Sequence, residues 1–197
     1  MKKRQQAKRP PRERLIEAAI EQIEAHGLAK LTVRAVAATA NANVASVNYY
    51  FRSKDALVAA ALETSIQNMV SDCNAYVDAM ADRPEEALSE LLAYLFEGGL
   101  RFPQLSKAHL HAAFTDDDYT GVFPVRFTPV MRRLAKAIQS AVPGLHAEQA
   151  AHRAVVALSG VFFPAFFSGL YAPLNALSTT SRKRYVRTLA QQACAPR

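Results

Sequence analysis

Apolar residues recur at helical spacing through almost the whole of this 197-residue chain. Leu15, Ile16, Ala19 and Ile23, for example, share one face of an expected helix, and no segment shows the strict alternation that half-buried strands require. Half of the residues are apolar and 21% are charged, which is typical of a chain that folds around a core. The sequence therefore predicts an all-α fold.

Glycine, proline and capping residues divide this pattern into successive helices. The first helix is expected from Pro11 to His26, where Gly27 ends it. A later helix, capped by Ser53, keeps its apolar period almost to Pro84, which gives it a length of roughly 40 Å. A helix of that length can connect two separate bodies.

The expected domain boundary lies inside that long helix, near Met69. A basic arm occupies residues 1–8, and a domain at residues 9–69 holds two short helices at about 32–51. A second helical domain occupies residues 70–197, in which Gly98-Gly99 is expected to end a helix.

The two short helices are the most informative part of the chain. Thr32 caps the first, Asn41-Ala42-Asn43 breaks it, and the second is expected over Val44–Phe51 with Val47 and Phe51 facing inward. Such a pair is what a helix-turn-helix needs: one helix braces against the DNA backbone and the other enters the major groove. A small helical corner with half-buried tyrosines has the same spacing, so spacing alone leaves both interpretations open.

The side chains around the second short helix suit DNA contacts of two kinds. Val44 and Ala45 can contact a thymine methyl group, while asparagine and serine side chains can hydrogen-bond bases or phosphates. Tyr49, Tyr50 and Lys54 can reach phosphates, whose contacts fix register without reading sequence.

Charge is concentrated at the N-terminus. The formal net charge is +7, and the first fourteen residues hold seven basic side chains against the single acid Glu13, so the remainder is close to neutral. A basic arm on a near-neutral body suggests a polyanionic partner at one end of the molecule. A solubilising tail has the same composition, and this alternative stays open.

The segments Thr32–Ala37 and Val47–Leu57 resemble the N-terminal domain of the TetR family of one-component bacterial regulators, and the resemblance covers about residues 9–69. It implies an all-helical homodimer that binds a palindromic operator in double-stranded DNA, usually as a repressor. It also implies that residues 70–197 dimerise and bind a small-molecule effector that releases the DNA.

Carried over residue by residue, the resemblance implies phosphate or base contacts for Thr32 and Tyr49, and a phosphate contact for Lys54. The sequence departs from the family pattern in having Asn41 for the usual glycine, and Asn43 for the usual serine or threonine cap. Asn48 stands where many members have tyrosine and is typical of another branch of the family. The whole segment Asn43–Phe51 is most similar to regulators that respond to fatty acids or acyl-CoA. The candidate DNA-binding residues are Thr32, Arg34, Asn43, Val44, Ala45, Ser46, Asn48, Tyr49, Tyr50 and Lys54.

The second domain offers no motif beyond Met80, only clusters of apolar residues, each of which alone is better explained as ordinary core. The aromatic residues of the second domain favour an apolar or aromatic effector over a highly charged one. The candidate pocket residues are Phe96, Phe102, His109, Phe114, Phe127, Met131, Phe162 and Phe166. In the family the last two helices form the dimer interface, for which the candidates are Leu158, Phe163, Phe167, Tyr185, Val186 and Leu189.

An enzyme is not expected, because no nucleophile elbow, phosphate loop or metal-ligand spacing occurs. We expect no cofactor and no metal, and we interpret Asp116–Asp118 as a solvated loop. The remaining alternative is a protein that binds DNA or an anionic surface without sequence preference and has no effector.

The two cysteines, Cys73 and Cys194, form no CxxC pair and favour a reducing compartment, so a cytoplasmic location is expected. The stretch Ala154–Ser181 contains no charged residue and is long enough to span a bilayer. Its serine, glycine and proline residues, and the likeness of such a helix to a buried dimer interface, argue against a span. We therefore expect no membrane partner.

Overall fold

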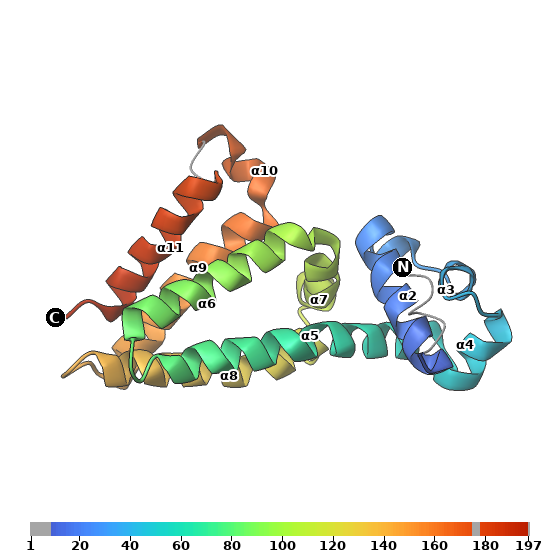
Figure 1. The fold of residues 1–197 in the computed structure, drawn as a ribbon, viewed down its shortest axis with the longest axis horizontal. Helices are drawn as coiled ribbons and strands as arrows, with labels where there is room; N and C mark the ends of the chain where they lie inside the picture. The colour runs from blue at the N-terminus through green and yellow to red at the C-terminus, as the bar shows by residue number, and fades with distance from the viewer. Residues whose placement is uncertain (1–8, 175–177, 197) are drawn as a thin grey trace. The chain divides into compact units, whose positions relative to one another are not determined.

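The computed structural model describes residues 9–174 and 178–196, and every regular element within these two ranges is a helix (Figure 1). The all-α prediction is therefore confirmed. The predicted basic arm, residues 1–8, lies outside the described residues.

The chain divides into two compact units, which we call the N-terminal and C-terminal units. The N-terminal unit consists of Met1–Asn68 and Gln104–Phe123, and the C-terminal unit of Met69–Pro103 and Pro124–Arg197. The long helix α5 (Lys54–Ala79) contributes to both. This division differs from the predicted domains, since Gln104–Phe123 was assigned to the second domain but groups with the first.

The N-terminal unit is built from short helices around a shared apolar core. Its elements are α2 (Pro11–His26), the 3-10 turn η1 (Leu28–Lys30), α3 (Val33–Thr39), α4 (Val44–Phe51), the first part of α5 and most of α7 (Pro103–Thr115). Helix α2 ends as predicted at Gly27, whose positive φ of 79° accompanies an N–H bond to Ile23 O of 2.8 Å. The buried core of the N-terminal unit includes Leu15, Ile23, Leu31, Val36, Val47, Phe51, Leu57, Ala61 and Ala108.

Side-chain caps fix where three of these helices begin. Thr32 Oγ1 accepts from Ala35 N at 3.1 Å before α3, and Asn43 Oδ1 accepts from Ser46 N at 2.7 Å before α4. Ser53 Oγ accepts from Ala56 N at 3.1 Å before α5. Each bond satisfies an amide that the helix itself leaves without a partner, and each cap contributes about 1 kcal/mol.

The C-terminal unit packs longer helices. Its elements are the second part of α5, α6 (Pro84–Arg101), most of α8 (Val122–Ala141), α9 (Ala147–Phe166), the short α10 (Ser168–Tyr171), the 3-10 turn η2 (Ala172–Leu174) and α11 (Thr179–Cys194). Helices α6, α9 and α11 pack against one another. Leu88, Leu91 and Leu92 of α6 are fully buried there, and each contributes roughly 1.5–3 kcal/mol by leaving water.

The prediction that Gly98-Gly99 ends a helix is wrong, because α6 continues to Arg101. A Cβ atom at Gly99 would lie only 2.9 Å from Ala165 Cβ of α9. Glycine is therefore needed at this position for the close approach of two helices rather than for a turn.

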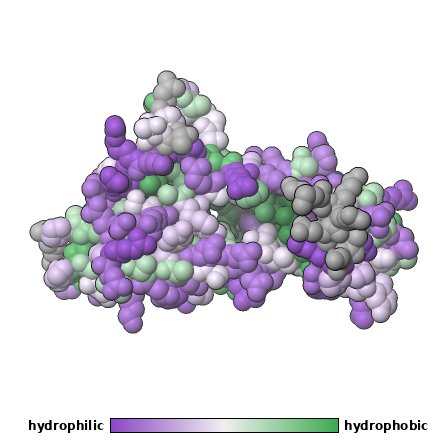
Figure 2. All heavy atoms as spheres, viewed as in Figure 1, coloured by the Kyte–Doolittle hydropathy of each residue, from purple (hydrophilic) through white to green (hydrophobic). Residues whose placement is uncertain are grey.

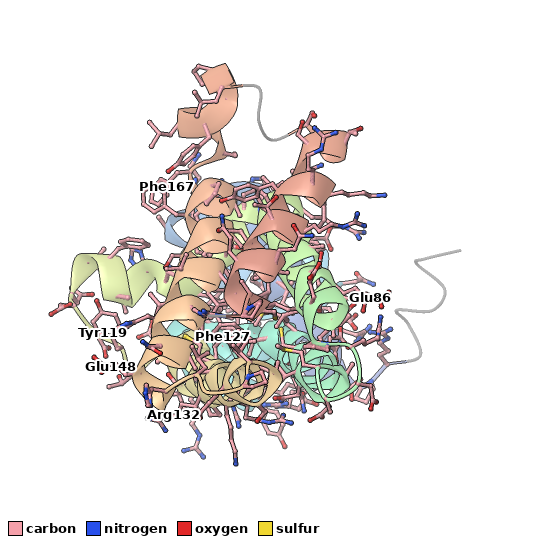
Figure 3. All side chains as sticks on the ribbon, turned by 90° about the vertical axis from the view of Figure 1, so that its left-hand side faces the viewer. Glu86, Tyr119, Phe127, Arg132, Glu148 and Phe167 are labelled. Carbon is pink, nitrogen blue, oxygen red and sulfur yellow. The ribbon has the colours of Figure 1, made fainter. Side chains whose placement is uncertain are left out.

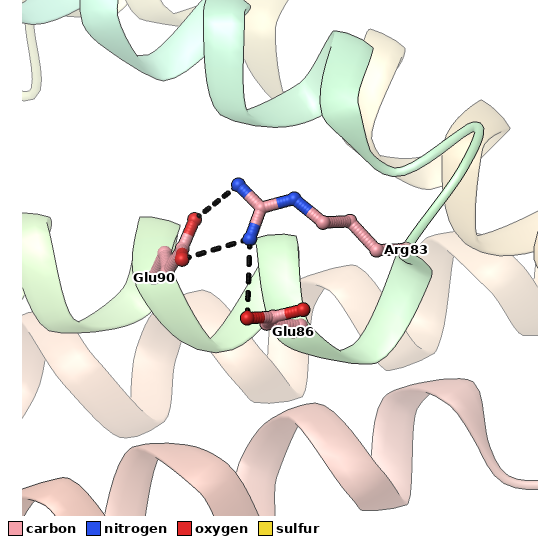
Figure 4. Close-up of polar contacts among 3 residues, drawn as sticks. All are labelled: Arg83, Glu86 and Glu90. Carbon is pink, nitrogen blue, oxygen red and sulfur yellow. Dashed lines mark hydrogen bonds and ion pairs between the residues drawn. The ribbon is translucent and has the colours of Figure 1, made fainter.

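Arg83 organises the turn between α5 and α6 (Figure 4). Its guanidinium donates to both carboxylate oxygens of Glu90, at 2.9 and 2.8 Å, and lies 3.3 Å from Glu86 Oε1. All three side chains are exposed, so the network contributes little free energy but fixes the direction in which α6 begins.

The uncharged stretch in α9 does not form one long span. No single helix within the described ranges is long and apolar enough to cross a membrane. Within the described ranges one pair passes the length and hydropathy test together, α9 with Ser168–Leu174, and the two are bent by 94°.

Candidate nucleic-acid interface

A tight turn joins α3 to α4. Asn41 has a left-handed backbone with φ of 51°, which asparagine tolerates better than most residues. Asn41 N–H donates to Ala38 O at 3.1 Å, and Ala42 N–H reaches back to Ala37 O at 2.8 Å. The last carbonyls of α3 are thereby satisfied within the turn itself, so the angle between the two helices is set locally.

The side chain of Asn43 makes two bonds at the start of α4. Its Oδ1 atom accepts from both Ser46 N and Ser46 Oγ, at 2.7 and 2.8 Å. Because a hydroxyl group has one proton, Ser46 Oγ has only its lone pairs left for a further partner. Asn43 keeps its amide N–H groups as donors beside it.

Helix α4 has a buried and an exposed face. Val47 and Phe51 are buried in the core of the N-terminal unit, and the guanidinium of Arg12 lies over the Phe51 ring, 5.3 Å from its centroid. The opposite face carries the side chains that were predicted to contact DNA, and of these Ser46 is half-buried. The exposed ones are Asn43, Val44, Ala45, Asn48, Tyr49 and Tyr50.

The two tyrosines form one aromatic edge on that face. Their rings meet edge to face, 5.0 Å between centroids and 85° between planes. Tyr49 exposes 79% of its surface, far more than a core aromatic does. Both rings are therefore accessible to a partner of α4.

Cationic and hydroxyl side chains flank the helix. Arg34 on α3 and Lys54 at the start of α5 are exposed, and Thr32 keeps its hydroxyl proton because its oxygen accepts the capping bond. Sequence reasoning missed Arg52, which is exposed between α4 and α5 with a left-handed φ of 62°. Its position between an aromatic pair and a capping serine was the available signal.

The structure brings together only part of the predicted effector pocket. Phe162 meets Phe127 edge to face and stacks on Phe166, each at 5.5 Å between centroids. Phe96 is buried and pairs instead with Tyr185 at 6.1 Å. Figure 3 places Phe127 inside the helical bundle.

The other predicted pocket residues do not join this cluster. Phe102, Phe114 and Met131 are exposed, so in this structure they do not line a closed cavity. His109 and Phe114 belong to the N-terminal unit, and the remaining candidates belong to the C-terminal unit.

The predicted dimer-interface residues also separate into two groups. Phe163 and Phe167 are exposed, with their rings 4.8 Å apart, and Figure 3 shows Phe167 at the edge of the bundle. Leu158 and Val186 are buried within the protomer, which leaves little of either side chain for a partner.

Tyr185 and Leu189 are half-buried on α11 and packed within the protomer. Tyr185 donates its hydroxyl proton to Gly160 O at 2.6 Å, and Leu189 lies against the same glycine. Sequence reasoning missed Val155 and Val156, which are 62% and 60% exposed. Their spacing before Phe163 along α9 was the signal.

Among the described residues no group of three histidine, cysteine, aspartate or glutamate side chains is arranged to hold a metal ion. The candidate site is therefore a surface made of α4 with its flanking caps and cations. Its chemistry is hydrogen bonding and charge.

Comparison with known proteins bears on this surface. Residues 15–61 match the family model described as bacterial regulatory proteins, tetR family. A curated relative, an uncharacterised HTH-type transcriptional regulator in the dhlA 5′ region of Xanthobacter autotrophicus, is 31% identical over 96 residues. The match covers 48% of this chain and 48% of that protein, so this chain spans about half the length of the curated relative.

Solved structures share the fold over nearly the whole chain. A protein from Mesorhizobium loti assigned to the TetR family superposes with a TM-score of 0.71 at 15% identity, covering 94% of this chain and 95% of that one. FadR of Bacillus subtilis, solved with stearoyl-CoA, gives 0.61 at 10% identity over 93% and 97%. The family model spans the helix-turn-helix built by α3 and α4, so residues 15–61 of this chain are similar to the bacterial regulatory proteins of the tetR family.

Proposed function

We propose that this protein is a homodimeric, sequence-specific DNA-binding repressor that an apolar small molecule releases from a palindromic operator. The observation that carries the proposal is the exposed face of α4, where small, amide and aromatic side chains are presented while Val47 and Phe51 anchor the helix. A helix so presented fits the major groove. The bacterial cytoplasm is the location that this function requires.

The exposed side chains divide into two roles. Val44, Ala45 and Asn48 lie where they can contact base edges, and the asparagine amide suits adenine. Tyr49, Tyr50 and Lys54 contact phosphates, as do Thr32 and Arg34 at the start of α3.

The bond between Ser46 and Asn43 sharpens the base-contacting role. Ser46 Oγ donates its proton to Asn43 Oδ1, so towards DNA it acts as an acceptor. Asn43 acts as a donor beside it. The pair therefore favours a base edge with an amino donor next to an acceptor, which adenine offers in the major groove.

The exposed face of α9 supports the homodimer. Val155, Val156, Phe163 and Phe167 form an apolar stripe at helical spacing, and such a stripe on a protein surface is typical of a partner interface. Two copies joined by this stripe present two α4 helices. A palindromic operator, with half-sites about one DNA turn or roughly 34 Å apart, is the kind of site that such a dimer would match.

The effector acts through the C-terminal unit in this proposal. The aromatic cluster of Phe127, Phe162 and Phe166 supports an apolar ligand class. Binding favours a state in which the two α4 helices have the wrong spacing for the operator. The ligand shifts that equilibrium only by its difference in affinity for the two states.

The test is selection of bound duplexes from a random pool with the full-length protein, followed by affinity measurements with three variants. Asn48→Ala and Ser46→Ala should lose about 1–3 kcal/mol on the selected duplex and much less on random DNA. Lys54→Ala should weaken both duplexes about equally. Equal losses on both duplexes for the first two variants would contradict base contact by α4.

A second candidate function rests on α11, which contains no acidic residue and exposes Lys183, Arg184 and Arg187. Figure 2 shows hydrophilic side chains gathered along this helix. A protein that binds polyanions without sequence preference would use such a stripe. It would show steep salt dependence and no enrichment in the selection.

A further inference from the structure

The exposed face of α9 is nearly symmetric about its middle. His152, Val155, Val156, Ser159 and Phe163 lie on one side of the helix at helical spacing, and all five are exposed. The two valines come four and three residues before Ser159, and Phe163 comes four residues after it. Large apolar side chains therefore lie at similar distances on either side of one small, polar residue.

This symmetry matches a second copy of the same helix. In an isologous contact, residue i of one copy meets residue j of the other and the reverse. If the copy is antiparallel, with the twofold axis at Ser159, Phe163 packs on the partner's Val155 and Val156, and the small serines let the helices approach closely. A parallel copy would set each residue against its own equivalent. Apolar packing alone allows both directions.

Helix α11 lies beside α9 and runs in the opposite direction. Arg153 of α9 donates through Nη1 to Ala193 O, near the end of α11, at 3.0 Å. Tyr185, in the first half of α11, donates its hydroxyl proton to Gly160 O, in the second half of α9, at 2.6 Å. The start of α11 is therefore next to the end of α9.

Charge decides between the two directions. Glu148 is exposed at the start of α9, and Lys183 and Arg184 are exposed near the start of α11, beside the end of α9. Figure 3 shows Glu148 and Phe167 towards opposite ends of α9. A parallel copy would bring Glu148 towards its own equivalent and the cations towards theirs. An antiparallel copy brings Glu148 towards the partner's cations at the rim, which is favourable.

The segment Ser168–Leu174, which forms α10 and η2, adds a second apolar surface. Each of its residues is exposed or half-buried, and Leu170 and Leu174 expose 68% and 70% of their surface. Figure 1 shows α10 extending away from the end of α9. Ordering such a segment costs backbone entropy, which burial of apolar side chains ordinarily offsets. A partner that covers the leucines supplies that burial.

Phe163 joins this segment to the exposed face of α9. Its ring centroid lies 4.8 Å from that of Phe167 and 6.0 Å from that of Tyr171. The two parts thus form one surface, and the chain carries no charged residue from position 154 to position 174. In the antiparallel arrangement Phe167, eight residues beyond the axis, reaches the partner's α9 near its His152, within the first turns of that helix.

We propose that α9 packs antiparallel on α9 of a second copy with Ser159 at the twofold axis, and that Ser168–Leu174 of each copy covers the first turns of the partner's α9. This inference rests on the homodimer of the proposed function. It adds the direction of pairing, the residues at the axis and the part taken by α10.

Disulfide formation in full-length protein tests the direction. The variants carry Cys194→Ser, since the other native cysteine, Cys73, is buried. A disulfide requires Cα atoms within about 7 Å. Ser159→Cys should give linked dimers on mild oxidation, seen by non-reducing gel electrophoresis, because each Ser159 meets its own copy. His152→Cys, seven residues away on the same face, is the matched control. It should give none, because its copy lies about 20 Å away along the helix axes.

Val156→Cys and Phe163→Cys test the same register away from the axis. Neither alone should link two copies, whereas the chain that carries both should. If each single variant links, His152→Cys included, the helices are parallel and the inference is overturned, although the homodimer stands. A protein that sediments as a dimer without linkage through Ser159→Cys also overturns it. A monomer at every concentration overturns the proposed homodimer itself.

A charge in α10 tests the covering segment. Leu170→Asp should raise the dimer dissociation constant at least about tenfold, because the carboxylate would lose water against the partner's α9. Val125→Asp on α8 is the matched control, since Val125 is also an exposed apolar residue of the C-terminal unit, and it should leave the constant unchanged. An unchanged constant for Leu170→Asp overturns the role of Ser168–Leu174 and leaves its leucines to another partner.

Discussion

Helices α4 and α9 both expose large apolar side chains, but their surroundings differ. On α4, Tyr49 and Tyr50 stand beside Asn43, Ser46 and Asn48, with cations on the neighbouring segments. On α9 the exposed side chains of Val155, Val156 and Phe163 lie in a part of the helix that carries no charged residue up to its end at Phe166. An apolar side chain among donors and cations suits a groove lined with bases and phosphates, whereas a largely apolar, uncharged surface suits another protein surface.

The neighbouring helix α11 sharpens this contrast. Its exposed stripe carries Lys183, Arg184 and Arg187, and its inward face carries Val186, Ala190 and Ala193. A dimer joined equally by α9 and α11 would bring these like charges towards their symmetry copies, which is unfavourable. We therefore infer that α9 contributes most of the proposed interface and that the basic stripe of α11 stays at its rim or outside it.

The largest expected effect is a charge placed in the α9 stripe. Phe163→Asp should raise the dimer dissociation constant by at least about 30-fold, corresponding to about 2 kcal/mol or more, because a carboxylate would lose its water in an apolar interface. Analytical sedimentation at several protein concentrations measures this dissociation constant. Arg187→Asp on α11 is the control and should leave the dimer intact. The reverse pattern, with Arg187→Asp dissociating the dimer, would assign the interface to α11.

The second effect is a loss of stability at low pH, which we expect in the N-terminal unit because that unit holds His109. Burial lowers the pKa of His109 to about 4, below its ordinary 6.5, so the unfolded chain takes up the proton first as pH falls. The stability contributed by neutral His109 is complete above pH 6.5 and is lost between 6.5 and about 4. Going from pH 7 to pH 5 should cost the N-terminal unit about 2 kcal/mol.

Urea unfolding at both pH values, monitored by circular dichroism, measures this loss. His109→Gln should remove it, since glutamine does not titrate. His152→Gln in the exposed part of α9 is the control and should leave the loss in place. A pH dependence unchanged by His109→Gln would mean that other groups cause it.

A smaller effect tests whether the hydroxyl group of Tyr49, on the aromatic edge of α4, contributes to DNA binding. Tyr49→Phe keeps the ring and removes only the hydroxyl group, which the proposal directs at a phosphate. Affinity should fall by about 1 kcal/mol on selected and random duplexes alike, with stability unchanged because the side chain is largely exposed. Filter binding and thermal unfolding provide the two measurements. A loss confined to the selected duplex would instead make Tyr49 a base contact.

Local signals in the sequence predicted the short helices of the N-terminal unit well. The ends of α2 and the caps at Thr32, Asn43 and Ser53 depend on residues three or four apart, which a sequence displays directly. The same holds for Val47 and Phe51, whose burial follows from their spacing in a short helix. These features are decided by neighbours along the chain.

Features decided by distant contacts were not predictable. The bond between Glu24 and Leu105 joins residues 81 positions apart, and nothing near either residue indicates it. Because α9 is apolar nearly all round, hydropathy does not tell which side faces inward, and so Leu158 was assigned to the interface while Val155 was missed. Gly99 was interpreted as a stop because its partner, Ala165, lies on another helix.

The smallest expected effect separates backbone strain from DNA contact at the end of α4. Arg52 has a φ of 62°, where a side chain other than glycine or asparagine is disfavoured by roughly 1 kcal/mol. Arg52→Gly should therefore raise the free energy of unfolding by about 0.5–1 kcal/mol, while operator affinity falls because an exposed cation beside α4 is lost. Asn41→Gly, in the turn before α4, is the control and should change stability less, since asparagine tolerates this backbone. A less stable Arg52→Gly protein would mean that the arginine side chain stabilises the N-terminal unit by more than its backbone strain costs. Greater stability with unchanged affinity would remove Arg52 from the DNA-binding surface.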